Sequence, residues 1–187
     1  MTGRNAPRPL PGERARAAEL ERMIRVDHAG ELGAARIYDG QLAVFGPTHA
    51  ATPVIRKMKD QEQSHLETFD RLVVEKGVRP TALSPLWDAA GFALGAATAL
   101  LGEKAAMACT AAVEEVINEH YQGQRDTLKR WGVEKDFEKT VASFQADEVH
   151  HRDTAYRHGA KEAAGYRALS GAIKAGCRAA IWLSKRI

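Results

Sequence analysis

Two short stretches of the sequence carry a glutamate followed, three residues later, by a histidine. In DQEQSH the pair is Glu62 and His65, and in DEVHH it is Glu148 and His151. Side chains at positions i and i+3 of a helix lie on one face, so each pair could bind the same metal ion if both stretches are helical. The repeat therefore predicts two metal-binding helices.

A further glutamate precedes each pair at a similar distance. Glu31 comes 31 residues before Glu62, and Glu114 comes 34 residues before Glu148. The chain thus has two halves that each supply one Glu and then one Glu-x-x-His pair, as in the helix bundles of ferritin-like dinuclear carboxylate proteins. These six residues are the candidate metal ligands and catalytic residues: Glu31, Glu62, His65, Glu114, Glu148 and His151.

The charge and chemistry of this ligand set favour two divalent ions. Four ionised carboxylates would be neutralised by two divalent cations, and neutral imidazoles add no charge. Hard oxygen ligands dominate and thiolates are absent from the set, so iron or manganese suits it better than zinc or copper(I). We expect two iron ions per chain with O2 as co-substrate, although the ligand chemistry alone leaves manganese open.

Apolar residues recur at helical spacing along the whole chain, and no stretch alternates like a strand. We expect an all-α fold, a ferritin-like four-helix bundle in a single domain of residues 1–187, with two additional helices and with residues 1–12 flexible. The expected helices are 13–45, 53–76, 84–101, 104–131, 134–158 and 162–186.

Each of the four bundle helices has an inward stripe of residues spaced three and four apart, and the acidic residues lie in these stripes. The stripe of the first helix, for example, includes Ile24, Glu31 and Tyr38. A carboxylate that faces a bundle core is costly unless its charge is compensated. A buried salt bridge could explain one such residue. Four of them, with no Lys or Arg in the same stripes, indicate bound metal.

Three further residues are candidates for contact with the metal ligands. Tyr121 and Asp27 lie in inward stripes, and Asp27 either orients a ligand imidazole or is an ordinary polar residue of the helix surface. His120 is either a hydrogen-bond partner or proton donor beside the site, or an ordinary surface histidine. We expect His28 to lie on the helix surface.

The composition indicates a folded domain and gives no support for a nucleic-acid-binding, disulfide-rich or secreted protein. Charged residues make up 27% of the chain and hydrophobic residues 44%, which is typical of a folded domain, and a net charge of +3 gives no argument for nucleic-acid binding. Cys109 and Cys177 form no CxxC motif, which favours a reducing compartment over a disulfide framework. The amino-terminal stretch has no apolar signal core, so we expect no secretion.

The two additional helices, within 84–101 and 162–187, have features of membrane-interfacial elements. The uncharged run 89–101 has 13 residues, which is too short to span a bilayer. The last helix has a basic stripe opposite an apolar side, with Trp182 at the border, as is typical of a helix at a membrane surface. The alternative for the helix within 84–101 is a buried connecting helix. The alternative for the last helix is binding in the groove of a partner protein. The basic stripe is Arg167, Lys174, Arg178 and Lys185, and the apolar side is Leu169, Ile173, Cys177 and Ala180.

From about residue 22 to residue 187 the sequence resembles the demethoxyubiquinone hydroxylases, a ferritin-like di-iron family. The motifs that carry the resemblance are RVDHAGELGA, KMKDQEQSHL, RPTALSPLWDAAGFALGAATALLG, AMACTAAVEEVINEHY and AGCRAAIWLSKRI. The family's metal ligands match the same six residues that the spacing selects. The resemblance implies O2-dependent hydroxylation of a polyprenyl methoxy-benzoquinol in ubiquinone biosynthesis.

The resemblance also implies partners and a location. We expect peripheral attachment to a lipid surface, on the cytoplasmic face of the inner membrane in a bacterium or the matrix side of the mitochondrial inner membrane in a eukaryote, beside other proteins of the pathway. Electrons would come from NADH bound near Arg22, Arg178, Trp182 and Arg186, where Trp182 replaces the family's Tyr.

Two other functions are compatible with the same residues. One is a ferritin-like ferroxidase or peroxidase. The other is a non-enzymatic, membrane-associated protein that binds a lipid or quinone and uses metal only for structure. Oxygen consumption with a reduced quinol would separate both from a hydroxylase.

Overall fold

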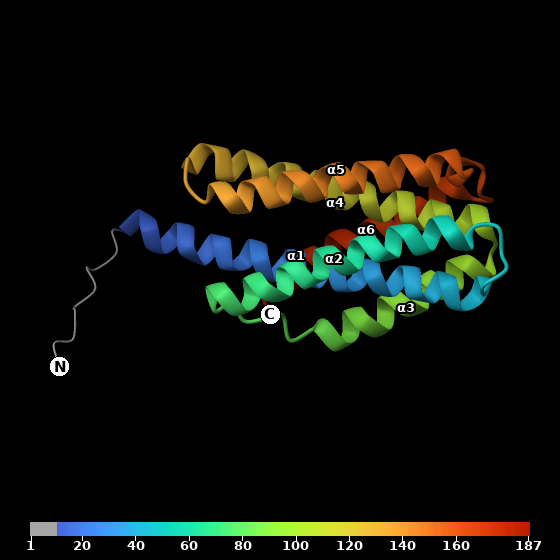
Figure 1. The fold of residues 1–187 in the computed structure, drawn as a ribbon, viewed down its shortest axis with the longest axis horizontal. Coiled ribbons are helices and arrows are strands. Elements are labelled where there is room, and N and C mark those ends of the chain that lie inside the picture. Colours follow the sequence, from blue (N-terminus) through green and yellow to red (C-terminus); the bar gives the residue numbers. More distant parts are fainter. Residues whose placement is uncertain (1–10) are drawn as a thin grey trace.

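Residues 11–187 are described by the computed structural model and contain six α-helices and one short 3-10 helix, without a strand in that range. Helices α1 (Pro11–Phe45) and α2 (Thr52–Lys76) form one hairpin, and α4 (Glu103–Trp131) and α5 (Lys135–Arg157) form a second (Figure 1). The predicted all-α helical bundle is therefore confirmed. The expected flexibility of residues 1–12 concerns a segment of which residues 1–10 lie outside the described part.

The two hairpins are joined by a long crossover. Helix α3 (Ser84–Leu100) runs back along the bundle beside α1, so that α2 and α4 point in the same direction (Figure 1). One such crossover connection is the topology of ferritin-like bundles. The last helix, α6 (Tyr166–Ser184), packs against α4.

Five helices begin and end within two residues of their predicted bounds, but the predicted start of the last helix is wrong. Residues Ala160–Glu162 form a 3-10 helix, and α6 begins only at Tyr166. Gly165 precedes α6 with φ 65°, a left-handed conformation that separates the two helices and that glycine adopts without steric cost.

The membrane-interfacial assignment of α6 relied on an apolar side that the structure uses elsewhere. Ile173 is buried against α4, with Leu169 and Cys177 beside it, and two of the basic residues pair with α4 side chains: Lys174 with Glu115 and Arg178 with Glu119. The solvent-facing side of α6 consists instead mainly of small residues and one tryptophan, namely Ala168, Gly171, Ala172, Ala175, Gly176, Ala179 and Trp182.

Two apolar clusters fill the bundle on either side of its middle. One cluster includes Ile55, Met58 and Met107, and the other includes Phe69 and Leu128. On each of the four bundle helices, the predicted metal ligands lie in sequence between the residues of the two clusters. The polar site is therefore enclosed by apolar side chains along the bundle axis.

Helix α3 approaches α1 closely enough to require glycine at the contact. A Cβ atom added to Gly95 would lie 1.9 Å from the carbonyl oxygen of Ile37, and one added to Gly40 would lie 2.2 Å from that of Phe92. Both clashes are with backbone atoms, which cannot rotate away. The glycines on both sides thus set the distance between the two helices.

Replacing Gly95 with Ala should destabilise the fold by forcing α3 away from α1. Overpacking of this kind typically costs about 1–3 kcal/mol, which urea unfolding would measure. Gly176→Ala on α6 is the matched control, because a Cβ atom added there would meet nothing within 4 Å and the φ of Gly176 is not left-handed. That change should stabilise the protein by about 0.4–1 kcal/mol. Equal unfolding midpoints for the two variants would contradict the packing argument.

Candidate metal centre

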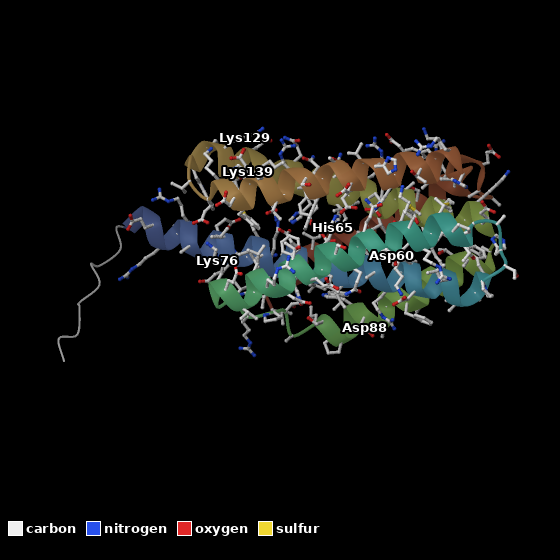
Figure 2. The ribbon with its side chains drawn as sticks, in the orientation of Figure 1. Asp60, His65, Lys76, Asp88, Lys129 and Lys139 are labelled. Atoms are coloured by element: carbon white, nitrogen blue, oxygen red, sulfur yellow. The ribbon has the colours of Figure 1, made fainter. Side chains whose placement is uncertain are left out.

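The six predicted ligands converge in the middle of the bundle. Each of α1, α2, α4 and α5 contributes at least one of them, and none is more than 3% exposed. Figure 2 shows His65 midway along the bundle, between α2 and α5, whereas Lys76, Lys129 and Lys139 lie towards one end. The spacing predicts this convergence, and the burial shows that the carboxylates face one another rather than solvent.

One group of four side chains, which we name position 1, surrounds the Nδ1 atom of His65. This nitrogen lies 3.2 Å from Glu148 Oε1, 3.4 Å from Glu31 Oε2 and 3.8 Å from Glu62 Oε2. The imidazole is stacked on Phe144, with ring centroids 3.8 Å apart. Its Nδ1 atom is thereby held towards the carboxylates.

A second group, position 2, surrounds the Nδ1 atom of His151. This nitrogen lies 2.9 Å from Glu62 Oε1, 3.3 Å from Glu148 Oε2 and 3.9 Å from Glu114 Oε1. In each position the four candidate ligand atoms lie within 4.8 Å of one another. Glu62 and Glu148 belong to both positions, with one oxygen towards each histidine, so their geometry would allow each of them to bridge two ions.

The donor atoms fit a metal because the protein leaves them without other partners. Eight buried oxygen and nitrogen atoms of the six residues accept or donate no hydrogen bond, including both oxygens of Glu62 and of Glu148 and the Nδ1 atoms of His65 and His151. Buried polar atoms are normally paired. Their number here, and their convergence on two points, indicate that cations complete the site.

The pKa values of the ligand side chains are shifted by burial and by the charges of their neighbours. Burial and the neighbouring carboxylates raise the pKa of Glu31 and of Glu114 well above the usual range. Although burial acts against ionisation, the neighbouring imidazoles of His151 and His65 lower the pKa of Glu62 to about 2. Burial favours a neutral His151 ring, but the nearby carboxylates of Glu148 and Glu62 raise its pKa to about 9. Metal binding here would be coupled to the release of protons from any ligand that carries one, because ligands bind metal in their deprotonated form.

Two tyrosines bind the carboxylates that belong to a single position. Tyr121 donates a hydrogen bond to Glu31 Oε1, and Tyr38 donates one to Glu114 Oε1 at 2.9 Å. Each tyrosine satisfies one oxygen and leaves Oε2 of its glutamate without a hydrogen bond. In Glu114 the oxygen bonded to Tyr38 is also the one nearer to His151, so Oε2 is the atom that remains available to a metal. The sequence predicted a place at the site for Tyr121 but gave Tyr38 no role there. The missed signal is that each tyrosine follows the glutamate of its own helix by seven residues.

Two further contacts hold the outer nitrogens of the histidines, and neither was predicted from the sequence. His65 Nε2 lies 3.2 Å from Asp147 Oδ2, and His151 Nε2 lies 3.2 Å from Gln61 Oε1. A neutral histidine that offers Nδ1 to a metal carries its proton on Nε2, so Asp147 and Gln61 are the acceptors. The sequence feature that could have identified them is that each directly precedes the Glu of a Glu-x-x-His pair.

Asp27 is buried, and its hydrogen bonds join it to residues of α4 and not to a ligand imidazole. Its Oδ1 atom accepts hydrogen bonds from Gln124 at 2.7 Å and from His120 at 3.1 Å. His120 is therefore a partner within the bundle and not an ordinary surface residue. His28 is also mostly buried, with a side chain 12% exposed and Nε2 3.0 Å from Asp70 Oδ1.

The residues expected at a nicotinamide site lie on two helices. Arg178, Trp182 and Arg186 lie on or directly after α6, and Arg22 lies on α1. The Arg186 guanidinium stacks over the Trp182 ring at 3.9 Å, and Trp182 is 55% exposed. The described contacts do not bring Arg22 to these three residues, so the grouping stays a prediction.

Comparison with known proteins supports a specific family. The family described as ubiquinone biosynthesis protein COQ7 matches residues 18–184. A Rhodospirillum rubrum protein named 3-demethoxyubiquinol 3-hydroxylase is 54% identical over 95% of this chain and 83% of its own length. A human protein named NADPH-dependent 3-demethoxyubiquinone 3-hydroxylase, mitochondrial, is 52% identical over 91% of this chain and 79% of its own.

A third relative, from Saccharomyces cerevisiae, is named 5-demethoxyubiquinone hydroxylase, mitochondrial, and is 44% identical over 92% of this chain and 80% of its own length. The matched region spans both halves of the carboxylate and histidine site. The chain therefore belongs to the ubiquinone biosynthesis protein COQ7 family.

Proposed function

We propose that this protein is a di-iron monooxygenase that hydroxylates the ring of demethoxyubiquinol in ubiquinone biosynthesis. The observation that carries the proposal is the buried pair of positions, in which four carboxylates and two imidazoles leave their inner atoms without protein partners. The family and the names of the relatives give the substrate class. Two electrons, two protons and one O2 would convert a ring C–H bond to C–OH and release one water molecule.

The two irons, when bound, would supply the O2 activation that amino-acid side chains cannot perform. The remaining functions belong to this chain. Glu62 and Glu148 would hold both ions, and Glu31 with Glu114 would each hold one. The hydroxyl groups of the two tyrosines fix the orientation of the latter pair. The apolar clusters on both sides exclude water from the oxidant.

The electron donor would be a reduced nicotinamide cofactor. NADH is the donor expected from the resemblance, whereas several relatives are named NADPH-dependent. The proposed site is the carboxyl-terminal part of α6, where Trp182 and Arg186 form an exposed stacked pair beside Arg178. Arg22 of α1 completes the set in the proposal.

The quinol would reach the site from a lipid surface that contacts α3 and α6. No helix within residues 11–187 is long and apolar enough to cross a membrane. Leu86, Leu100 and Leu101 are more than half exposed, and Trp182 of α6 is exposed as well. Trp87 of α3 donates a hydrogen bond to Ser184 of α6 at 3.0 Å, so the two helices are held together at one end. This apolar face suits peripheral attachment, beside other ubiquinone-biosynthesis proteins, to the bacterial inner membrane or its mitochondrial counterpart.

The number of bound ions should depend on which carboxylate is removed. Glu62→Ala should lose both ions, because Glu62 belongs to both positions, whereas Glu31→Ala and Glu114→Ala should each keep about one. Metal analysis after anaerobic loading with Fe(II) would measure this. Glu67→Ala, an exposed residue of the same helix as Glu62, is the control and should keep two. Two ions in Glu62→Ala would show that the site is assigned wrongly.

Iron-loaded wild-type protein should insert one atom from O2 into a demethoxyubiquinol analogue, and His151→Ala should reduce this activity to background. Mass spectrometry of the product formed under 18O2 would show one labelled oxygen per turnover. Rapid iron oxidation without product would identify a ferroxidase. Metal binding without O2 consumption would identify a non-enzymatic protein.

Charges on the exposed leucines should weaken binding to lipid vesicles. The double change Leu100→Glu and Leu101→Glu removes apolar surface worth roughly 1.5–3 kcal/mol per side chain when buried. We expect at least about a tenfold loss of affinity in co-sedimentation with phosphatidylethanolamine and phosphatidylglycerol vesicles. Val133→Glu, in the α4–α5 turn at the other end of the bundle, is the control (Figure 1). Equal losses in both variants would place the lipid surface elsewhere.

A further inference from the structure

The two metal positions are related by an approximate twofold repeat, and the repeat is broken at one contact. Asp147 and Gln61 occupy equivalent places, each directly before the Glu of a Glu-x-x-His pair and each 3.2 Å from the Nε2 atom of the histidine on the opposite helix. The geometry is therefore the same on both sides. The charge differs, because Asp147 is a carboxylate and Gln61 is a neutral amide.

A second difference lies on the same side of the site. Asp27 precedes Glu31 by four residues and bonds Gln124, whereas Thr110 precedes Glu114 by four residues and lies 3.4 Å from the amide nitrogen of Gln41. Position 1 thus has an aspartate where position 2 has a threonine. Asp27 acts at a distance, since it contacts no ligand, so Asp147 is the residue that can affect a ligand directly.

A carboxylate that accepts the outer proton of an imidazole makes the inner nitrogen a stronger donor to a cation. It also adds a negative charge one ring away from the metal. A neutral amide holds the ring in the same orientation without either effect. Asp147 is 38% exposed, and solvent screening places its effect near the lower end of the range known for such contacts.

We propose that the two positions are inequivalent and that Asp147, acting through His65, makes position 1 the tighter metal site. This inference rests on the proposed di-iron function and specifies how its two ions differ. Asp147 and Gln61 are positioning residues, because they act on the histidines and touch neither the metal nor the substrate. An iron-poor cell would therefore fill position 1 first.

Isosteric substitutions separate the charge from the hydrogen bond. Asp147→Asn keeps an acceptor oxygen and removes the charge, and Gln61→Glu keeps the shape and adds one. Both can be measured by calorimetric titration of the metal-free protein with Co(II), which needs no O2 and no substrate. Two cations repel each other, so the second binds more weakly than the first even if the two positions are identical. Two unequal binding steps in the wild-type protein are therefore not evidence, and the test is the comparison of the variants. Asp153→Asn, on the same helix and paired with Arg152, is the control for loss of surface charge.

We expect Asp147→Asn to weaken the tighter step by about tenfold, Gln61→Glu to strengthen the weaker step, and Asp153→Asn to change neither. Variants that keep only one metal position show at which position Asp147 acts. With Glu114→Ala, which leaves position 1, Asp147→Asn should still weaken binding; with Glu31→Ala, which leaves position 2, it should have no effect.

Two results distinguish failure of the inference from failure of the proposed function. If the wild-type protein binds two Co(II) ions and Asp147→Asn gives the same isotherm as Asp153→Asn, the positions do not differ through Asp147. The inference is also overturned if Asp147→Asn and Gln61→Glu alter the same step. If the wild-type protein binds fewer than two ions, the proposed dinuclear site itself is wrong.

Discussion

The main constraint on this structure is the mutual repulsion of four carboxylates, which the helix bundle holds out of water at its centre. Removing such groups from water is costly, and placing them side by side increases the cost. Burial, together with this repulsion, raises the pKa of Glu31, whereas the neighbouring imidazoles lower the pKa of Glu62 despite its burial. Two divalent cations would offset the repulsion more completely. The fold therefore holds a site that bound metal would stabilise.

The rest of the bundle keeps this arrangement from relaxing. Apolar clusters above and below the site prevent the carboxylates from turning towards solvent, and each tyrosine hydroxyl fixes one terminal carboxylate. The long crossover through α3 brings α4 antiparallel to α1, so equivalent residues of the two halves face each other. In the proposed function, the same enclosure that makes the site costly without metal would protect an oxidant from water once metal is bound.

Sequence periodicity predicted the bundle and the convergence of the six candidate ligands because a helix fixes which residues share a face. It could not predict contacts that depend on how two helices are rotated against each other. The pairing of Asp147 with His65 across α2 and α5 is of this kind, as is that of Asp27 with His120 across α1 and α4. Helix α6 shows the same limit: its small-residue side and its larger apolar side are both compatible with burial, and only packing against α4 decides between them.

The most direct measurement of the central claim is anomalous diffraction at the iron absorption edge from crystals of the protein loaded with Fe(II). Inward-facing carboxylates that share two cations predict two peaks about 3.5–4 Å apart, with Glu62 and Glu148 between them and one histidine at each. A single peak, or iron bound only at the surface while Glu31, Glu62, Glu114 and Glu148 keep their present contacts, would contradict the account.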